Sequence, residues 1–477
     1  MRDCLTLLLV AYLVPVRAFR GNANLYTSET TPARPDTVTL KLLPSSLQQG
    51  GRCIDGTMAG YYFREGTDPS LFVIHMEGGG ACADKESCTE RSKTDYGSSS
   101  TWEKTVPATG TFSSSCAENP DFCNASAVYV RYCTGDCHSG NNTVASDITW
   151  GFYFDGHTNL AAIVDELERE HGLGVAKHVL LSAGSAGSVG AFTNIDWLAS
   201  RLPKAVVKGA PVAGWFTPAA LPDDPQQVPG AMPSDWAHFI AGTHGSSGNK
   251  SVEEFLVERI WESKGLLPAA CIAAKKEDWV LCRSLDSLYR YIESPLYVIE
   301  NQFDAHQLYK VELLPRGKTS NATEQTMINE YMRRYGEAMR NSTQQILEDV
   351  PIKKKRRPDG LFHPSCLKHM VAITDVLVQG QDWLTILGDW YFERDQLKQY
   401  HRLVESCPAS AAGLPCNPAC SYGPPTPGGG CKAALTADGC LPTPHTLHSC
   451  GKCALKHEAD LRAAGCTPET VKALCEA

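Results

Sequence analysis

The sequence has little excess of charge of either sign and few long apolar runs. Its 44 Lys and Arg residues against 53 Asp and Glu residues give a formal net charge of −9. A mildly acidic chain lacks the broad positive surface with which proteins bind nucleic acid, so we expect no nucleic-acid partner. Beyond the first residues, no apolar segment approaches the roughly 20 residues that span a bilayer, so we expect no integral membrane anchor. With 43% apolar and 20% charged residues, the composition also excludes a mostly disordered chain.

Cysteine, by contrast, is abundant, with 20 residues. So many thiols are typical of proteins from oxidising compartments, where they pair as disulfides. The N-terminal segment agrees, because Arg2 precedes a short apolar run, Leu5–Val16, and a small-residue cleavage pattern follows at residues 16–18. We therefore predict a signal peptide over residues 1–18 and a secreted or lumenal mature protein. Cys4 would leave with this peptide, and the 19 remaining cysteines imply one free or intermolecular thiol.

Five Asn-x-Ser/Thr triplets fit this compartment. Each triplet alone is a weak signal, but behind a signal peptide some of them should carry glycan on exposed loops. The predicted acceptors are Asn124, Asn141, Asn249, Asn321 and Asn341.

Cysteine density divides the chain into a large domain, over residues 19–404, and a small disulfide-rich C-terminal tail, over residues 405–477. Nine cysteines lie between Cys407 and Cys475, and residues 424–430 read Pro-Pro-Thr-Pro-Gly-Gly-Gly, which is typical of turns and linkers. Cys450 and Cys453 in the tail could form a redox or zinc pair. In a secreted and cysteine-dense segment, ordinary disulfides are the favoured interpretation.

Apolar strand-like runs alternate with amphipathic helical patterns through the large domain. The expected strands are residues 71–74, 128–130, 178–181, 206–207 and 296–299. Between them, apolar residues recur at helical spacing over residues 160–167 and 191–202. This alternation predicts an α/β fold with a mostly parallel central sheet and helices on both faces. In such sheets, functional residues gather on the loops at the carboxyl ends of the strands.

Ser185 lies at one of these strand ends, directly before a predicted helix, in Leu180-Leu-Ser-Ala-Gly-Ser-Ala-Gly-Ser-Val-Gly190. A hydroxyl on a tight strand–helix turn, beside the unpaired N–H groups of a helix N-terminus, suits a nucleophile next to an oxyanion hole. Ala183 replaces the first glycine of the usual Gly-x-Ser-x-Gly pattern, so its Cβ could crowd the turn. The glycines match neither a P-loop nor a dinucleotide-binding loop. A tight turn with a packing role only is the remaining interpretation.

A nucleophilic serine needs a base, and the base needs an acid that orients it. In α/β-hydrolase-like chains, the acid and then the histidine follow the serine in sequence. Asp304 follows the strand expected at residues 296–299, where such an acid belongs. Two late histidines, His363 and His369, are candidates for the base, and their spacing does not separate them.

The segment Glu77-Gly-Gly-Gly-Ala-Cys82 follows the strand expected at residues 71–74. Consecutive glycines let backbone N–H groups approach a substrate oxygen closely, as the second half of an oxyanion hole. The alternative is a flexible loop without a ligand. A local disulfide between Cys82 and Cys88 would close and stiffen this segment.

Together these motifs resemble the pectin acetylesterase/Notum family. The resemblance spans roughly residues 50–420 and implies a serine carboxylesterase of α/β-hydrolase-like fold. The motifs that carry it occur in the same order and at similar spacing: Arg52-Cys-x-Asp-Gly56, Glu77-Gly-Gly-Gly-Ala-Cys82 with Cys88, Arg131-Tyr-Cys133, Gly184-Ser-Ala-Gly187, Phe303-Asp304 with Gln307, Ser365-Cys-x-x-His369, Cys407-Pro and Cys416-Asn-Pro-x-Cys420.

The resemblance also implies roles for individual residues. Ser185 would be the nucleophile, Asp304 the acid and His369 the base, which removes His363 from the site. No metal or organic cofactor is implied. The oxyanion would be bound by three backbone N–H groups, those of Gly79, Gly80 and Ala186.

Two departures from the family bear on the substrate. Ala81 stands where the family has an aromatic residue, and Gly80 stands where Notum has tryptophan, so the acyl pocket should differ in shape. A basic segment, Lys353–Arg357, precedes His369. It is interpreted as a solvated loop, with a processing site for a furin-like protease or a contact for an acidic glycan as alternatives.

Three functions are consistent with these features. The favoured one is a secreted esterase that removes O-acetyl groups from a polysaccharide such as pectin. The second is a Notum-like deacylase that removes a long acyl chain from a secreted protein. The third is a catalytically weak pseudo-esterase that binds glycan.

Overall fold

The structure is a computed structural model, and it describes residues 36–47, 50–216, 254–311, 322–348, 358–370 and 376–420. Several predicted features lie outside the described residues: the signal peptide, the tail from residue 421 onward with its Cys450–Cys453 pair, the basic segment Lys353–Arg357, and the sequons at Asn249 and Asn321.

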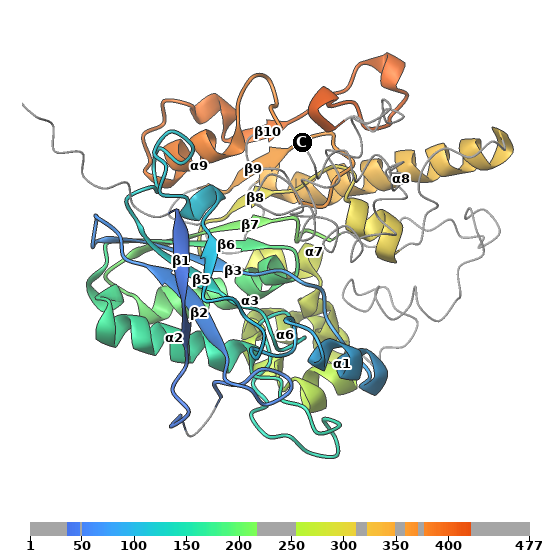
Figure 1. The fold of residues 1–477 in the computed structure, drawn as a ribbon. Coiled ribbons are helices and arrows are strands. Elements are labelled where there is room, and N and C mark those ends of the chain that lie inside the picture. Colours follow the sequence, from blue (N-terminus) through green and yellow to red (C-terminus); the bar gives the residue numbers. More distant parts are fainter. Residues whose placement is uncertain are drawn as a thin grey trace, which may run out of the picture. The chain divides into compact units, whose positions relative to one another are not determined.

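In the described part of the chain, ten strands form one sheet in the order β10-β9-β8-β7-β6-β3-β5-β2-β1-β4 (Figure 1). Every neighbouring pair from β10 to β5 is parallel, and the pairs from β5 to β4 are antiparallel. The prediction of a mostly parallel sheet is therefore confirmed. The parallel strands are β3 (Leu71–Met76), β5 (Ser126–Val130), β6 (His178–Gly184), β7 (Val206–Val212), β8 (Tyr297–Ile299), β9 (Gly360–His363) and β10 (Arg402–Val404), and the others are β1 (Thr37–Leu42), β2 (Gly60–Arg64) and β4 (Thr105–Pro107).

Helices cover both faces of this sheet. The helices α2 (Gly156–Glu170) and α3 (Ala186–Arg201) lie on one face, and α9 (Trp383–Tyr391) lies on the other (Figure 1). The long helix α8 (Ala322–Leu347) contributes to the same apolar cluster as α2 and α3. The remaining α-helices of the described residues are α1 (Lys85–Ser92), α6 (Ala269–Lys275) and α7 (Leu285–Leu288). None of the helices found in the described ranges is long and apolar enough to cross a membrane.

The central strand β3 shows why both faces need cover. Phe72 and Ile74 join the cluster that includes α2 and α3, whereas Leu71 and Val73 join the cluster that includes α9. All four side chains are at most 4% exposed. Because burying such a side chain contributes roughly 1.5–3 kcal/mol, a strand that is apolar on both sides is stable only between two layers of helices.

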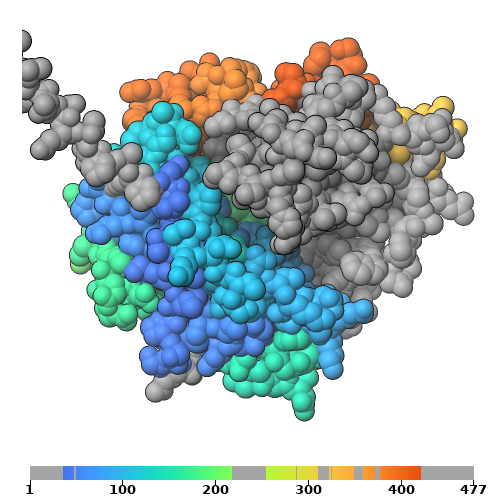
Figure 2. Space-filling model, in the orientation of Figure 1, coloured from blue at the N-terminus to red at the C-terminus, as the bar shows by residue number. Residues whose placement is uncertain are grey.

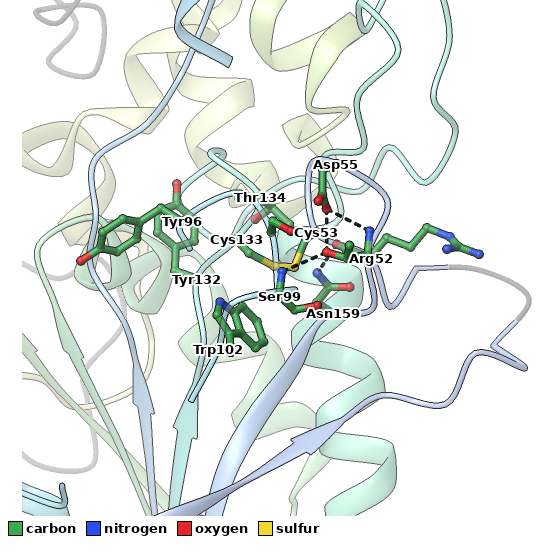
Figure 3. Close-up of a disulfide and its surroundings, with 12 residues drawn as sticks. Arg52, Cys53, Asp55, Tyr96, Ser99, Trp102, Tyr132, Cys133, Thr134 and Asn159 are labelled. Atoms are coloured by element: carbon green, nitrogen blue, oxygen red, sulfur yellow. Dashed lines mark hydrogen bonds between the residues drawn. A yellow bond between two sulfur atoms is a disulfide. The ribbon is translucent and has the colours of Figure 1, made fainter. Parts of the chain in front are cut away.

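Six disulfides stabilise the loops of the described chain. Figure 3 shows the one between Cys53 and Cys133, next to Trp102 and Asn159. The Asn159 side chain donates to the Arg52 carbonyl (2.8 Å) and so ties α2 to this cross-link. The other pairs are Cys82–Cys88, Cys116–Cys123, Cys271–Cys282, Cys366–Cys420 and Cys407–Cys416.

The first part of the predicted tail is closely attached to the large domain. Cys420 bonds to Cys366, and the Ser365 N–H donates to the carboxylate of Glu405 (2.7 Å).

Cys137 is a buried free cysteine of the described residues, and burial raises the pKa of its thiol to about 11. It is therefore protonated and unreactive at neutral pH.

A buried carboxyl group precedes α2 and makes stability depend on pH. Asp155 is fully buried, and its side chain does not cap the helix. Burial and the neighbouring Asp136 raise the pKa of Asp155 from 3.8 to about 7. The folded state therefore holds this proton more tightly than the unfolded state. Asp155 does not affect stability below about pH 4, reduces it progressively as the pH rises to 7, and reduces it fully above that.

We expect Asp155→Asn to stabilise the protein at pH 8 by about 2–4 kcal/mol, since each pKa unit corresponds to 1.36 kcal/mol. The gain should shrink toward zero at pH 4. Denaturant unfolding of both proteins at pH 4, 6 and 8, with the disulfides intact, measures this difference. An equal gain at all three pH values would show that the Asp155 charge is not the cause.

Candidate active site

Three polar side chains converge at one edge of the sheet. Ser185 follows β6, Asp304 follows β8, and His369 lies on the loop beyond β9. The His369 Nε2 is 2.7 Å from the Ser185 Oγ, and the His369 Nδ1 is 2.7 Å from the Asp304 Oδ2. These residues meet because β6, β8 and β9 run in the same direction and end at the same edge.

Ser185 occupies a strained turn between β6 and α3. Its φ of 52° and ψ of −122° lie in a region that non-glycine residues rarely adopt, at a cost of roughly 1–3 kcal/mol. The Ser185 N–H donates to the Val212 carbonyl of the neighbouring strand (2.9 Å), which helps to hold this conformation. The side chain is thereby presented at the carboxyl edge of the sheet, next to the first turn of α3.

The crowding that we expected at Ala183 does not occur. Ala183 is the penultimate residue of β6 and packs in the apolar core, so its Cβ lies within a regular strand. The glycine that the turn requires is Gly187, because a Cβ there would lie 2.1 Å from the Met76 carbonyl oxygen. The close approach of α3 to the end of β3 therefore explains the second glycine of the pattern.

Asp304 is fully buried, and hydrogen bonds define its orientation. Its Oδ1 accepts from the Gln307 N–H (2.7 Å), while its Oδ2 contacts His369. Gln307 is held in turn by the hydroxyl of Tyr335 (2.8 Å). A carboxylate in this position favours the imidazole tautomer with the proton on Nδ1, which leaves Nε2 free to accept the proton of Ser185.

A second carboxyl group, Glu300, lies near Asp304. Its Oε2 accepts from the Trp215 N–H (2.7 Å). Burial, and then the neighbouring Asp304, raise the pKa of Glu300 well above its ordinary value. Burial and the charge of Asp304 therefore disfavour the ionised form of Glu300, which limits the negative charge that gathers around Asp304.

The two candidate histidines lie in different surroundings. His363 is the last residue of β9, is fully buried, and contacts the Glu300 carbonyl through Nδ1 (2.7 Å). Burial lowers the pKa of His363 to about 4, so the ring is neutral and donates this hydrogen bond. His363 is thus a core residue, whereas His369 is the histidine that contacts Ser185.

The three consecutive glycines Gly78–Gly80, here called the glycine loop, pack against the turn at Ser185. A Cβ on Gly78 would lie 2.9 Å from the Ser185 Cβ, so only a glycine permits this contact. Gly79 and Gly80 have φ values of +140° and +68°. Among the described residues, no group accepts a hydrogen bond from the N–H of Gly79, Gly80 or Ala186. Cys82 and Cys88 form a disulfide directly after this loop.

Three further side chains lie beside the site, and no sequence motif predicts them. The His306 ring centroid is 4.8 Å from that of His369, and Phe216 stacks on His369 at 6.3 Å. Met370 is 44% exposed and lies against Gly184. The sequence indicates a position near the site only for His306, which lies two residues after Asp304. This proximity does not distinguish a residue of the site from an ordinary loop residue.

Comparison with known proteins adds relatives of two kinds. A family model described as Pectinacetylesterase matches residues 31–421. Pectin acetylesterase 11 from Arabidopsis thaliana is 28% identical over 399 residues, which cover 80% of this chain and 92% of the relative. Palmitoleoyl-protein carboxylesterase NOTUM from Homo sapiens is 28% identical over 389 residues, which cover 77% of this chain and 70% of the relative. The solved structure of the Wnt deacylase Notum from Drosophila has the same fold, with a TM-score of 0.63 and 23% identity over 81% of this chain and 100% of that one.

Proposed function

Since the chain belongs to the pectinacetylesterase family and is a carboxylic ester hydrolase, we propose that Ser185, Asp304 and His369 are its catalytic triad. The main support for this proposal is the pair of 2.7 Å contacts that His369 makes, one to Ser185 and one to Asp304. Such an arrangement matches a nucleophile, a general base and an orienting acid.

In the proposed mechanism, the Ser185 Oγ attacks the ester carbonyl carbon while His369 Nε2 takes the hydroxyl proton. The tetrahedral intermediate collapses, the C–O bond to the alcohol breaks, and the His369 imidazolium returns its proton to the leaving alcohol. Water then attacks the acyl-enzyme with His369 as base, which releases the carboxylic acid and restores Ser185. Asp304 stabilises the imidazolium in both half-reactions. The residues named here need no metal or organic cofactor.

The negative charge of the tetrahedral intermediate would be bound by the N–H groups of Gly79, Gly80 and Ala186. These groups lack partners within the described chain, and Ala186 is the first residue of α3, where the helix dipole is positive. Donors held in place before the reaction stabilise an oxyanion without reorganisation, which accounts for a large share of the catalysis in such sites.

We infer that the substrate is an O-acetylated polysaccharide such as pectin. A long acyl chain requires an apolar tunnel, whereas a short acyl group on a polar alcohol tolerates polar side chains beside the triad. His306 places a polar ring beside His369, and a Cβ at Gly80 would have no atom of the described residues within 4 Å, so these residues leave space beside Gly80. Both observations favour a small acyl group on a polar alcohol. The alternatives are a Notum-like lipid deacylase and a glycan-binding pseudo-esterase.

We also propose that the protein is secreted and that residues 1–18 are its signal peptide. The six disulfides of the described chain are typical of an oxidising compartment. The three described sequon asparagines are all exposed, as glycosylation requires: Asn124, Asn141 and Asn341.

Acyl-chain length tests the substrate assignment. With aryl esters of two to sixteen carbons, we expect kcat/KM to be highest for acetate and to fall by at least about tenfold at eight carbons. Acetate release from acetylated pectin and acetylated xylan then identifies the polymer. A maximum at eight or more carbons would instead indicate a lipid deacylase, and failure to hydrolyse aryl acetate would indicate a pseudo-esterase.

A further inference from the structure

Arg91, in the last turn of α1, contacts the glycine loop from outside the proposed triad. Its Nη1 donates to the Gly79 carbonyl, and its Nε donates to the Tyr96 carbonyl, both at 2.9 Å. The guanidinium also lies over the ring of Tyr132 at 4.8 Å and that of Tyr96 at 5.7 Å. These two tyrosines are labelled in Figure 3. Two hydrogen bonds and two rings therefore define both the position and the plane of the guanidinium.

The Gly79 carbonyl and the Gly80 N–H belong to one peptide group. A trans peptide is planar, so its C=O and N–H point in opposite directions. Because Arg91 binds the C=O, the Gly80 N–H points away from Arg91. This N–H has no hydrogen-bond partner within the described chain, as a donor reserved for a substrate oxygen requires.

On the basis of the proposed function, we propose that Arg91 is a positioning residue that aims the Gly80 N–H at the oxyanion of the transition state. Consecutive glycines rotate easily, so a peptide between Gly79 and Gly80 without an anchor would sample several orientations. The cationic donor holds one of them. It also polarises the amide, because a hydrogen bond to the C=O strengthens the N–H of the same peptide as a donor.

The local fold keeps Arg91 within reach of the loop. Asp84 caps α1 in a capping box with Ser87, so the helix begins at a defined residue. The Cys82–Cys88 disulfide then links the glycine loop to the helix that carries Arg91. α1 lies on the face of the molecule drawn in Figure 2. In this interpretation, the disulfide maintains the distance between the glycine loop and Arg91.

Kinetics of Arg91→Ala and Arg91→Lys test this role in the full-length enzyme. With aryl acetate, we expect Arg91→Ala to lower kcat by roughly 10²-fold, the scale of losing one oxyanion donor, while KM changes by less than about threefold. Added guanidinium or ethylguanidinium should restore part of the kcat of Arg91→Ala, and Arg91→Lys should retain an intermediate kcat. Arg169→Ala is the matched control, because Arg169 is an exposed arginine paired with Glu170, and its loss should leave kcat unchanged.

Each outcome supports or overturns the role of Arg91. A raised KM with an unchanged kcat would assign Arg91 to substrate binding. A loss of activity proportional to the unfolded fraction, without rescue by guanidinium, would assign it to stability alone. Either result overturns the proposal. A fully active Arg91→Ala beside an inactive Ser185→Ala would overturn only this inference, whereas an active Ser185→Ala would overturn the proposed function.

Discussion

Replacing Ser185 with alanine should lower kcat by a factor on the order of 10³–10⁶ while the protein remains folded. The substitution removes the Oγ that is 2.7 Å from His369, and with it the covalent intermediate. Water attacking the ester directly, with help from the oxyanion donors, would account for the residual rate. Steady-state hydrolysis of aryl acetate measures the loss, and circular dichroism and the melting temperature report the fold.

The control for this substitution is Ser200→Ala. Ser200 is an exposed serine near the end of α3, and its hydroxyl donates to the Trp197 carbonyl (2.7 Å). Its loss should leave kcat and KM unchanged. If Ser185→Ala retained most of the activity, Ser185 would not be the nucleophile, and the turn at residue 185 would have a packing role only.

Replacing His369 with alanine should lower kcat by as much as the loss of Ser185. Nucleophile and base act as a unit, so the double variant Ser185→Ala/His369→Ala should be no slower than either single variant. The same assay on all three proteins measures this non-additivity. A double variant in which the two losses multiply would show that the residues act independently.

His363→Gln is the matched histidine control. This ring is buried and donates to the Glu300 carbonyl, so its replacement should cost stability, on the order of 1–3 kcal/mol. Catalysis per folded molecule should be retained, because His363 does not touch Ser185. If His363→Gln were inactive and folded while His369→Ala remained active, the base would have been assigned to the wrong histidine.

Much of the fold and part of the site could be predicted from local patterns. The strands at residues 71–74, 128–130 and 178–181 were predicted from short apolar runs, and each lies within an observed strand. Ser185 was predicted at a strand–helix junction because a strand pattern ends and a helical pattern begins there. Both kinds of evidence depend on residues that are neighbours along the chain, so no tertiary information was needed.

Other features depend on contacts between distant segments. Spacing left His363 and His369 equivalent, and the end of β9 between them separates a core residue from a loop residue. No pattern connects Arg91 to the Gly79 carbonyl or places His306 beside His369. The buried position of Asp155, which raises its pKa, is equally invisible in the sequence.

Local patterns were sufficient to predict five of the described strands, the helices α2 and α3, the serine turn and the glycine loop, and the order of the motifs indicated the family. Each of these features depends on residues that are close together or in a fixed order along the chain. Only the tertiary structure decided which side chains meet. His369 is 184 residues from Ser185 and 65 from Asp304, and their contacts exist because parallel strands deliver all three loops to one edge of the sheet. The path of each loop beyond its strand depends on the packing of the whole domain, which no local pattern encodes.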